Sequence, residues 1–166
     1  MRKLLRINLA EFIFKKCSHG LLSKLFKHRI LSLKTLGLHI TTECNYNCIY
    51  CYAERYKENK LPLEKIFSLI DEGKSLGAEF VNLLGGEPFL NKDLDKIIYH
   101  IHRNNMHPII FTNGSLITDS WVRFFKKIDK ITLVVKYDYD DGVYAKLTRS
   151  RVPIREIEEN IKKLIK

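Results

Sequence analysis

Long apolar runs are missing from this chain, and so are low-complexity tracts and convincing internal repeats. The opening "MRKLLRINLAEFIF" is basic at its start, but Arg6 and Glu11 interrupt its apolar run, and no small-residue cleavage site follows. A transmembrane helix needs about 20 mostly apolar residues, and a signal peptide needs an apolar stretch before its cleavage site. The sequence therefore predicts neither a signal peptide nor a transmembrane segment.

Cysteine is also scarce. The chain has four cysteines, and three of them fall within the stretch "CNYNCIYC" at 44–51. Cys48 and Cys51 are too close in sequence for an ordinary structural disulfide, and no partner cysteines are spread along the chain. This pattern argues against a disulfide framework and favours a metal site in a reducing compartment, the cytoplasm.

Charge is unevenly distributed over the 166 residues. Residues 1–35 hold nine basic residues and one acidic residue, a charge of +8, whereas 36–166 carry only +2. Apolar spacing within 3–33 predicts two helical pieces with a break at 18–20. We therefore predict a basic helical extension over 1–35 and a main domain over 36–166. The extension could be a solvated helix face, or a surface for an acidic partner, a nucleic acid or an anionic membrane.

The main domain alternates strand and helix patterns. Strands are predicted at 36–41, 79–85, 108–112 and 130–136, and helices at 62–77, 91–105, 118–128 and 153–166, with Thr118 as a capping residue of the third helix. This alternation favours an α/β fold with a parallel sheet and right-handed crossovers. A closed eight-unit barrel needs about 200 residues or more. The prediction is therefore a partial parallel (β/α) barrel of about four strand–helix units.

Every unusual segment follows one of these strands. "TTECNYNCIYC" follows the first strand, "GGEP" the second, "TNG" the third and "KYDYDDG" the fourth. In parallel α/β folds, ligands bind beyond the carboxyl ends of the strands. We therefore expect the four segments to form a single site.

The three clustered thiols suit a soft metal or an iron–sulfur cluster. A closed zinc site and a protein-held four-iron cluster both usually have four protein ligands, so three cysteines leave one position open. The alternatives are zinc with a fourth ligand such as His39, or three idle thiols. Cys17, at the end of the first helical piece, is expected to be a lone thiol outside the site.

The chain resembles the radical S-adenosylmethionine (radical SAM) enzymes. The resemblance rests on Cys44, Cys48 and Cys51 in the spacing Cys-x3-Cys-x2-Cys, on Tyr50 before the third cysteine, and on "GGEPFL" at 85–90. It implies that the three thiolates hold a 4Fe-4S cluster and that S-adenosylmethionine chelates the remaining iron. One electron would then cleave the sulfonium and release a 5′-deoxyadenosyl radical, which abstracts hydrogen from a substrate.

The resemblance also implies roles for the other motifs. The backbone at Tyr50 would lie beside the adenine. Gly85 and Gly86 would let a ligand approach closely, and Glu87 would accept from the methionine ammonium. Asn113 of "TNG" is first a turn former, but many relatives that act on peptides have a similar motif. Where relatives often have Ser-x-Asp, this chain has Lys136, which could supply a cation, and Asp138, which matches.

The family usually has six strand–helix units, whereas this chain ends after the fourth. Its last strand is then an open edge that invites pairing. A partner chain, a second copy of this chain, the amino-terminal helices or further units of a longer enzyme could cover it. The predicted function is reductive cleavage of S-adenosylmethionine, with a peptide or protein as the favoured substrate class and a flavodoxin or ferredoxin as electron donor. The alternatives are a glycyl-radical activating enzyme and a non-catalytic iron–sulfur or zinc module.

Overall fold

The computed structural model describes residues 33–52, 61–137 and 140–165. The helices predicted within 3–33, the thiol of Cys17 and the carboxylate of Asp138 lie outside the described residues. The basic extension over 1–35 therefore stays a prediction. The compact unit that carries the predicted strands begins at Leu33.

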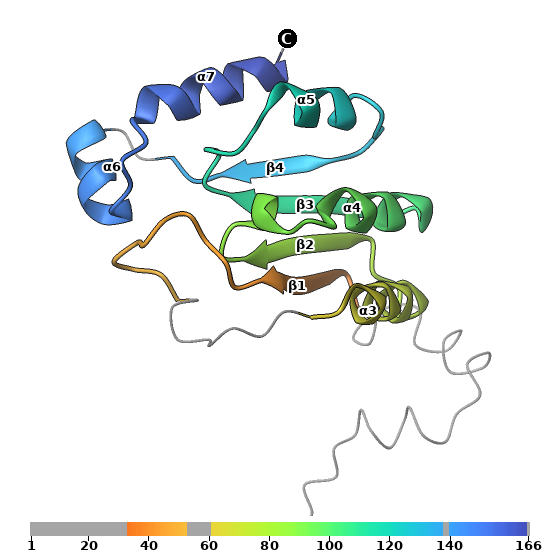
Figure 1. Cartoon of the computed structure of the whole chain (residues 1–166). Helices are drawn as coiled ribbons and strands as arrows, with labels where there is room; N and C mark the ends of the chain where they lie inside the picture. Colours follow the sequence, from red (N-terminus) through yellow and green to blue (C-terminus); the bar gives the residue numbers. More distant parts are fainter. Residues whose placement is uncertain (1–32, 53–60, 138–139, 166) are drawn as a thin grey trace, which may run out of the picture. The chain divides into compact units, whose positions relative to one another are not determined.

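This unit is a four-stranded parallel sheet with helices between its strands (Figure 1). In chain order the elements are β1 (Thr35–Thr41), α3 (Leu63–Ser75), β2 (Phe80–Gly85), the short 3-10 helix η2 (Pro88–Leu90), α4 (Leu94–Arg103), β3 (His107–Thr112), α5 (Asp119–Phe125), β4 (Thr132–Val135), α6 (Asp141–Thr148) and α7 (Ile154–Ile165). The predicted parallel α/β fold of four strand–helix units is confirmed.

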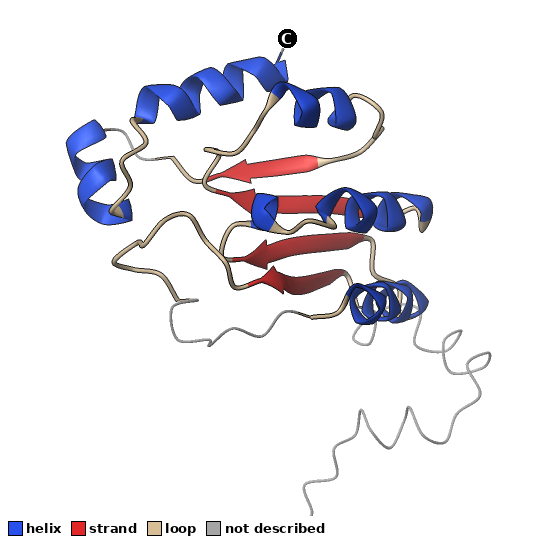
Figure 2. Ribbon diagram, in the orientation of Figure 1, coloured by secondary structure: helices blue, strands red, loops and turns tan. Residues whose placement is uncertain are grey.

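The strands lie in the order β1-β2-β3-β4, and all three neighbouring pairs are parallel. Their carboxyl ends therefore all lie at the same end of the sheet, as Figure 2 shows. Within the described residues β1 and β4 are edge strands, so the open edge predicted at the fourth strand is confirmed there.

The main core lies between the sheet and its helices. Every second strand residue faces it, including Leu38, Ile40, Val81, Leu83 and Ile110, each of which is at most 5% exposed. Helices α3 and α4 contribute apolar residues at helical spacing from the same side (Figure 1): Ile66, Ile70, Leu94, Ile97, Ile98 and Ile101. Burying a side chain of this size stabilises the fold by about 1.5–3 kcal/mol. This core fixes the sheet whose edge carries the motifs.

Helix α6 is absent from the sequence-based prediction. The acidic residues and Gly142 of "KYDYDDG" are turn formers, and they favour a loop. In the structure Asp140 is the N-cap residue, and its carboxylate accepts a 2.9 Å hydrogen bond from the Val143 N–H. The aspartate pair Asp140-Asp141 is therefore a helix start signal, which sequence reasoning missed.

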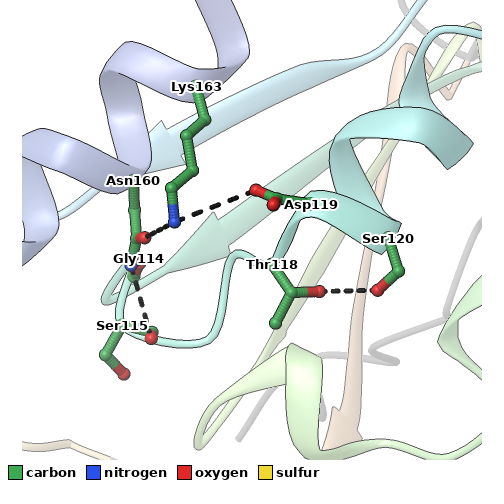
Figure 3. A network of polar contacts seen from close by, with 7 residues as sticks. All are labelled: Gly114, Ser115, Thr118, Asp119, Ser120, Asn160 and Lys163. Carbon is green, nitrogen blue, oxygen red and sulfur yellow. Dashed lines mark hydrogen bonds and ion pairs between the residues drawn. The ribbon is translucent and has the colours of Figure 1, made fainter.

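The cap predicted for the third helix is only partly right. Thr118 holds the N-cap position of α5, but its hydroxyl caps no backbone N–H and instead lies 2.6 Å from the Ser120 hydroxyl (Figure 3).

Nearby, the buried Asn160 of α7 donates from Nδ2 to the Gly114 carbonyl at 3.0 Å. Helix α7 is therefore tied to the loop that follows β3.

Candidate functional site

The loop after β1 and the loop after β2 are joined through their backbones. The N–H of Gly86 donates to the Thr41 carbonyl at 2.9 Å, and the N–H of Glu87 donates to the Glu43 carbonyl at 2.7 Å. The cysteine segment and "GGEP" therefore start side by side in the structure. The sequence predicted this, because both segments follow parallel strands. We call residues 42–52 the cysteine loop.

The two glycines make this contact possible. A Cβ atom on Gly85 would lie 2.1 Å from the Thr41 carbonyl oxygen, and one on Gly86 would lie 2.1 Å from that of Glu43. Gly85 also has a φ of +146°, which other residues rarely adopt. In this structure, the group that approaches the two glycines is therefore the chain's own backbone. From the sequence, a ligand is expected to approach them as well.

Glu87 is fully buried and connects β2 to β3. Its Oε1 accepts from the Thr112 hydroxyl at 2.8 Å and from the Phe89 N–H at 3.2 Å, and its Oε2 accepts from the Asn113 N–H at 2.8 Å. Burial raises the pKa of the Glu87 carboxyl, and the three donors oppose that rise. A carboxylate has about four acceptor positions, so one on Oε2 remains for a further donor.

Asn113 extends this network to the cysteine loop. Its Nδ2 donates to Asn45 Oδ1 at 2.8 Å, and Asn45 Nδ2 in turn donates to the Ser115 hydroxyl at 2.8 Å. The Ser115 N–H and hydroxyl both bond Asn113 Oδ1. The amide of "TNG" therefore forms the predicted turn and also holds the loop between the first two cysteines.

The three cysteines share this loop but do not form a finished ligand set. Within the described residues, no group of three or more His, Cys, Asp or Glu side chains is placed to hold a metal ion. Cys44 is an exposed residue, while Cys48 and Cys51 are half-buried. His39, the alternative zinc ligand, packs edge-on against Tyr52, with ring centroids 5.7 Å apart.

The thiols are nevertheless close enough to affect one another. Desolvation raises the pKa of Cys44 most, and the negative charges of Glu87, Cys48 and Cys51 raise it further. The Tyr46 N–H, which donates to Cys44 Sγ at 3.4 Å, lowers it. A positively charged metal centre would relieve this repulsion between thiolates, so the donor set fits a thiolate-bound cluster.

Lys136 points its ammonium at two aromatic rings. Its Nζ lies 4.6 Å from the ring centroid of Tyr50 in the cysteine loop and 5.4 Å from that of Tyr144 in α6. Such cation–π contacts contribute about 0.5–2 kcal/mol. The structure therefore brings Lys136 and Tyr50 together, as a single site requires. Tyr144 is a second partner of the lysine, which sequence reasoning missed.

Helix α6 holds the far side of the cysteine loop. The N–H groups of Asn47 and Ile49 donate to the carbonyls of Thr148 (3.2 Å) and Leu147 (2.9 Å). These donors flank Cys48 in the sequence.

Two tyrosines strengthen the contact between α6 and the loop. The buried Tyr144 hydroxyl donates to Tyr46 at 3.3 Å, and both rings share a small core with Ile154 and Ile157. Desolvation raises the pKa of Tyr144, which keeps this donor protonated. Sequence reasoning missed these residues because an unpredicted helix carries one of them.

The segments that follow β2, β3 and β4 thus contact the cysteine loop that follows β1. The Radical SAM superfamily model matches residues 38–166, and the chain belongs to that family. A Selenomonas ruminantium protein, S-adenosylmethionine-dependent nucleotide dehydratase, is 35% identical over 104 residues, which cover 60% of this chain and 38% of that protein.

The fold agrees with solved structures of the Streptococcus suis protein SuiB, at 26% identity. SuiB bound to S-adenosylmethionine matches with a TM-score of 0.70 over 86% of this chain and 32% of SuiB. SuiB bound to its precursor peptide SuiA matches with a TM-score of 0.73 over 96% and 36%. The chain thus spans about a third of the length of SuiB. Among the described residues, every helix is too short or too polar to cross a bilayer.

Proposed function

We propose that this chain binds a 4Fe-4S cluster and S-adenosylmethionine and cleaves the latter reductively to start radical chemistry. One observation carries the proposal: the Cys-x3-Cys-x2-Cys loop is bonded through its backbone to Gly86 and Glu87 at the carboxyl edge of the sheet. Membership of the radical SAM family supports it. The reducing compartment that it needs is the cytoplasm.

Cys44, Cys48 and Cys51 would hold the cluster, which supplies the electron that cleaves the sulfonium. The backbone at Tyr50 would lie beside the adenine. Glu87 would offer its free acceptor position to the methionine ammonium, and Gly85 and Gly86 would keep the surrounding backbone in place.

Asn113 would hold the loop that carries the cysteines, since its amide bonds Asn45. Lys136 would fix the Tyr50 ring by its cation–π contact and present a cation where relatives often have a serine. Asp138, outside the described residues, is proposed as a cofactor contact on its motif alone.

A peptide or protein is the proposed substrate class. The "TNG" motif supports this choice, and so does the similarity to SuiB, which was solved with a precursor peptide. The nucleotide dehydratase relative supports a small-molecule substrate instead. A cleavage assay with a peptide and a nucleotide as competing substrates distinguishes the two.

A second candidate is a non-catalytic iron–sulfur or zinc module. It is favoured by the open edge at β4 within the described residues. That edge would bind a partner chain or a second copy of this chain. In the enzyme proposed first, a partner that covers this edge would also exclude water from the reactive site.

Anaerobic reconstitution tests the proposal. The expected result is about four irons per chain, with conversion of S-adenosylmethionine to 5′-deoxyadenosine and methionine under dithionite. Cys48→Ala is the matched control, which should bind little iron and cleave nothing. Zinc in place of iron, or an iron-loaded chain without cleavage, would favour the module.

A further inference from the structure

The end of α6 that contacts the cysteine loop is basic. Residues 142–155 contain four basic residues and no acidic residue. Lys146 and Arg149 directly flank Leu147 and Thr148, whose carbonyls accept the N–H groups of Ile49 and Asn47. Arg151 comes two residues later. The cations therefore stand beside the loop segment that contains Cys48.

These cations are not used within the described fold. Lys146, Arg149 and Arg151 are exposed, and the ion pairs between described residues include none of them. The two acids at the start of α6 have other partners, since Asp140 accepts from the Val143 N–H and Asp141 from the Ile154 N–H. A cation near a helix C-terminus stabilises the helix, but only within the last turn. That effect accounts for Lys146 and for Arg149, the C-cap residue of α6, and leaves Arg151 unexplained.

Exposed apolar side chains lie beside the cations. Ile49 and Tyr50 of the cysteine loop are 51% and 48% exposed, and Val143 of α6 is 50% exposed. Val143 lies one helical turn before Leu147, whose carbonyl accepts the Ile49 N–H. Protein–protein interfaces typically have an apolar centre with a polar rim, and they are enriched in aromatic residues and Arg.

We propose that Ile49, Tyr50, Val143, Lys146, Arg149 and Arg151 form a docking surface for an acidic electron-donor protein of the flavodoxin or ferredoxin class. This inference rests on the proposed function, because only a redox centre at the cysteine loop needs such a partner. The donor loses one electron and the cluster gains one, with no bond made or broken in that step.

Charge and position both favour this partner. Electron transfer slows steeply with distance, so the donor must approach the cysteine loop itself, where this surface lies. A cluster of unpaired cations attracts an acidic partner and raises its rate of encounter. A nucleic acid or an anionic membrane would use the same charges, so the experiment must separate these ligands from the donor.

The test compares two triple charge reversals in the full chain. The first is Lys146→Glu, Arg149→Glu and Arg151→Glu. The matched control is Lys126→Glu, Lys127→Glu and Lys130→Glu, which changes the charge equally at exposed residues before the amino end of β4. Iron content and the unfolding midpoint of each variant check folding. The corresponding Gln variants provide a milder series if a reversal disturbs the fold.

Calorimetry measures binding of a purified flavodoxin at low and high ionic strength. The first reversal should weaken binding at least about tenfold and remove most of its salt dependence, whereas the control should change it less than about threefold. Reduction of the reconstituted cluster by reduced flavodoxin should slow in the first variant only. Reduction by dithionite should be similar in all three proteins.

Equal losses in both reversals, or no loss in either, would overturn the docking surface. Binding of phosphatidylserine vesicles or of RNA that is lost only in the first reversal, without flavodoxin binding, would overturn it in favour of that ligand. Failure of dithionite-driven cleavage in the unmodified chain would instead reject the proposed function. Flavodoxin binding can be measured independently of that cleavage, so the two failures are distinguishable.

Discussion

The backbone N–H of Asn113 donates a 2.8 Å hydrogen bond to Glu87 Oε2, which joins the loop after β3 to the loop after β2. Two motifs that lie 26 positions apart in the chain thus share one buried carboxylate. Because Glu87 is fully buried, water cannot replace the carboxylate as the acceptor for its three donors. This relationship makes Glu87 a structural connector as well as a proposed cofactor contact.

Glu87→Gln should therefore destabilise the fold. The NH2 group of the glutamine cannot accept a hydrogen bond. It would therefore face a donor without a bond, either the Asn113 N–H or the pair formed by Phe89 and Thr112. We expect a loss of about 1–3 kcal/mol in the free energy of unfolding, measured by denaturant titration. Glu72→Gln, at an exposed position of α3, should be nearly neutral. Equal stability of the two variants would contradict the connector role.

The same change should weaken cofactor binding. Loss of a charged acceptor costs about 1.5–3 kcal/mol, or roughly tenfold to a hundredfold in affinity for S-adenosylmethionine. Calorimetry on the iron-loaded chain measures this affinity. Unchanged affinity would remove the Glu87 carboxylate from the cofactor site while leaving its structural role intact.

Stability should also depend on pH through Glu87. Burial raises the pKa of this carboxyl in the folded chain above its ordinary value of 4.5. The folded state therefore holds the proton more tightly, and this contribution is fully present below pH 4.5. It is lost as the pH rises through the folded pKa. Unfolding titrations across this range should show a decline in the unmodified chain that Glu87→Gln lacks. If stability changed with pH in the same way in the unmodified chain and in Glu87→Gln, the three donors would lower the Glu87 pKa by as much as burial raises it.

Gly86→Ala should disrupt the join between the two loops. Its Cβ would lie 2.1 Å from the Glu43 carbonyl oxygen and 2.8 Å from that of Thr42, so backbone must move. We expect a cost of roughly 1–3 kcal/mol or more, together with poorer iron retention after reconstitution. Gly37→Ala is the control, because its Cβ would meet only Leu84 at an ordinary 3.6 Å. Iron loading of Gly86→Ala at the level of the control would be evidence against the join.

Tyr144→Ala should free the cysteine loop from α6. The ring is 1% exposed within the small core around Tyr46, and its removal should cost about 3 kcal/mol. Tyr144→Phe keeps the ring and loses one hydrogen bond, so it should cost less than about 1.5 kcal/mol. Iron retained after gel filtration should fall in the alanine variant and stay near normal in the phenylalanine variant. Equal retention would show that α6 does not support the loop.

Single replacement of Cys44, Cys48 or Cys51 by alanine should abolish the brown chromophore of the reconstituted chain, since thiolates hold the iron. Cys17→Ala should leave it intact. Visible absorbance and iron analysis measure both effects. A loss of chromophore in Cys17→Ala would add a fourth thiol to the ligand set.

The sequence by itself determined the parallel α/β fold and the edge that carries the motifs. Apolar periodicity identified four strands and the helices between them, because burial of one face dictates that spacing. The carboxyl ends of parallel strands share an edge, so "CNYNCIYC", "GGEP" and "TNG" had to meet. The structure confirms that meeting through the bonds between Glu43 and Glu87 and between Asn45 and Asn113.

Only the tertiary structure decided how these segments hold one another. The hydrogen bond from Tyr144 to Tyr46 spans 98 positions, and Asn47 and Ile49 pair with a helix that the sequence did not predict. Local patterns report which face of an element is buried, and they carry no record of the partner across such a distance. The burial of Glu87 and the close backbone beside Gly86 likewise arise only when β1, β2 and β3 lie side by side.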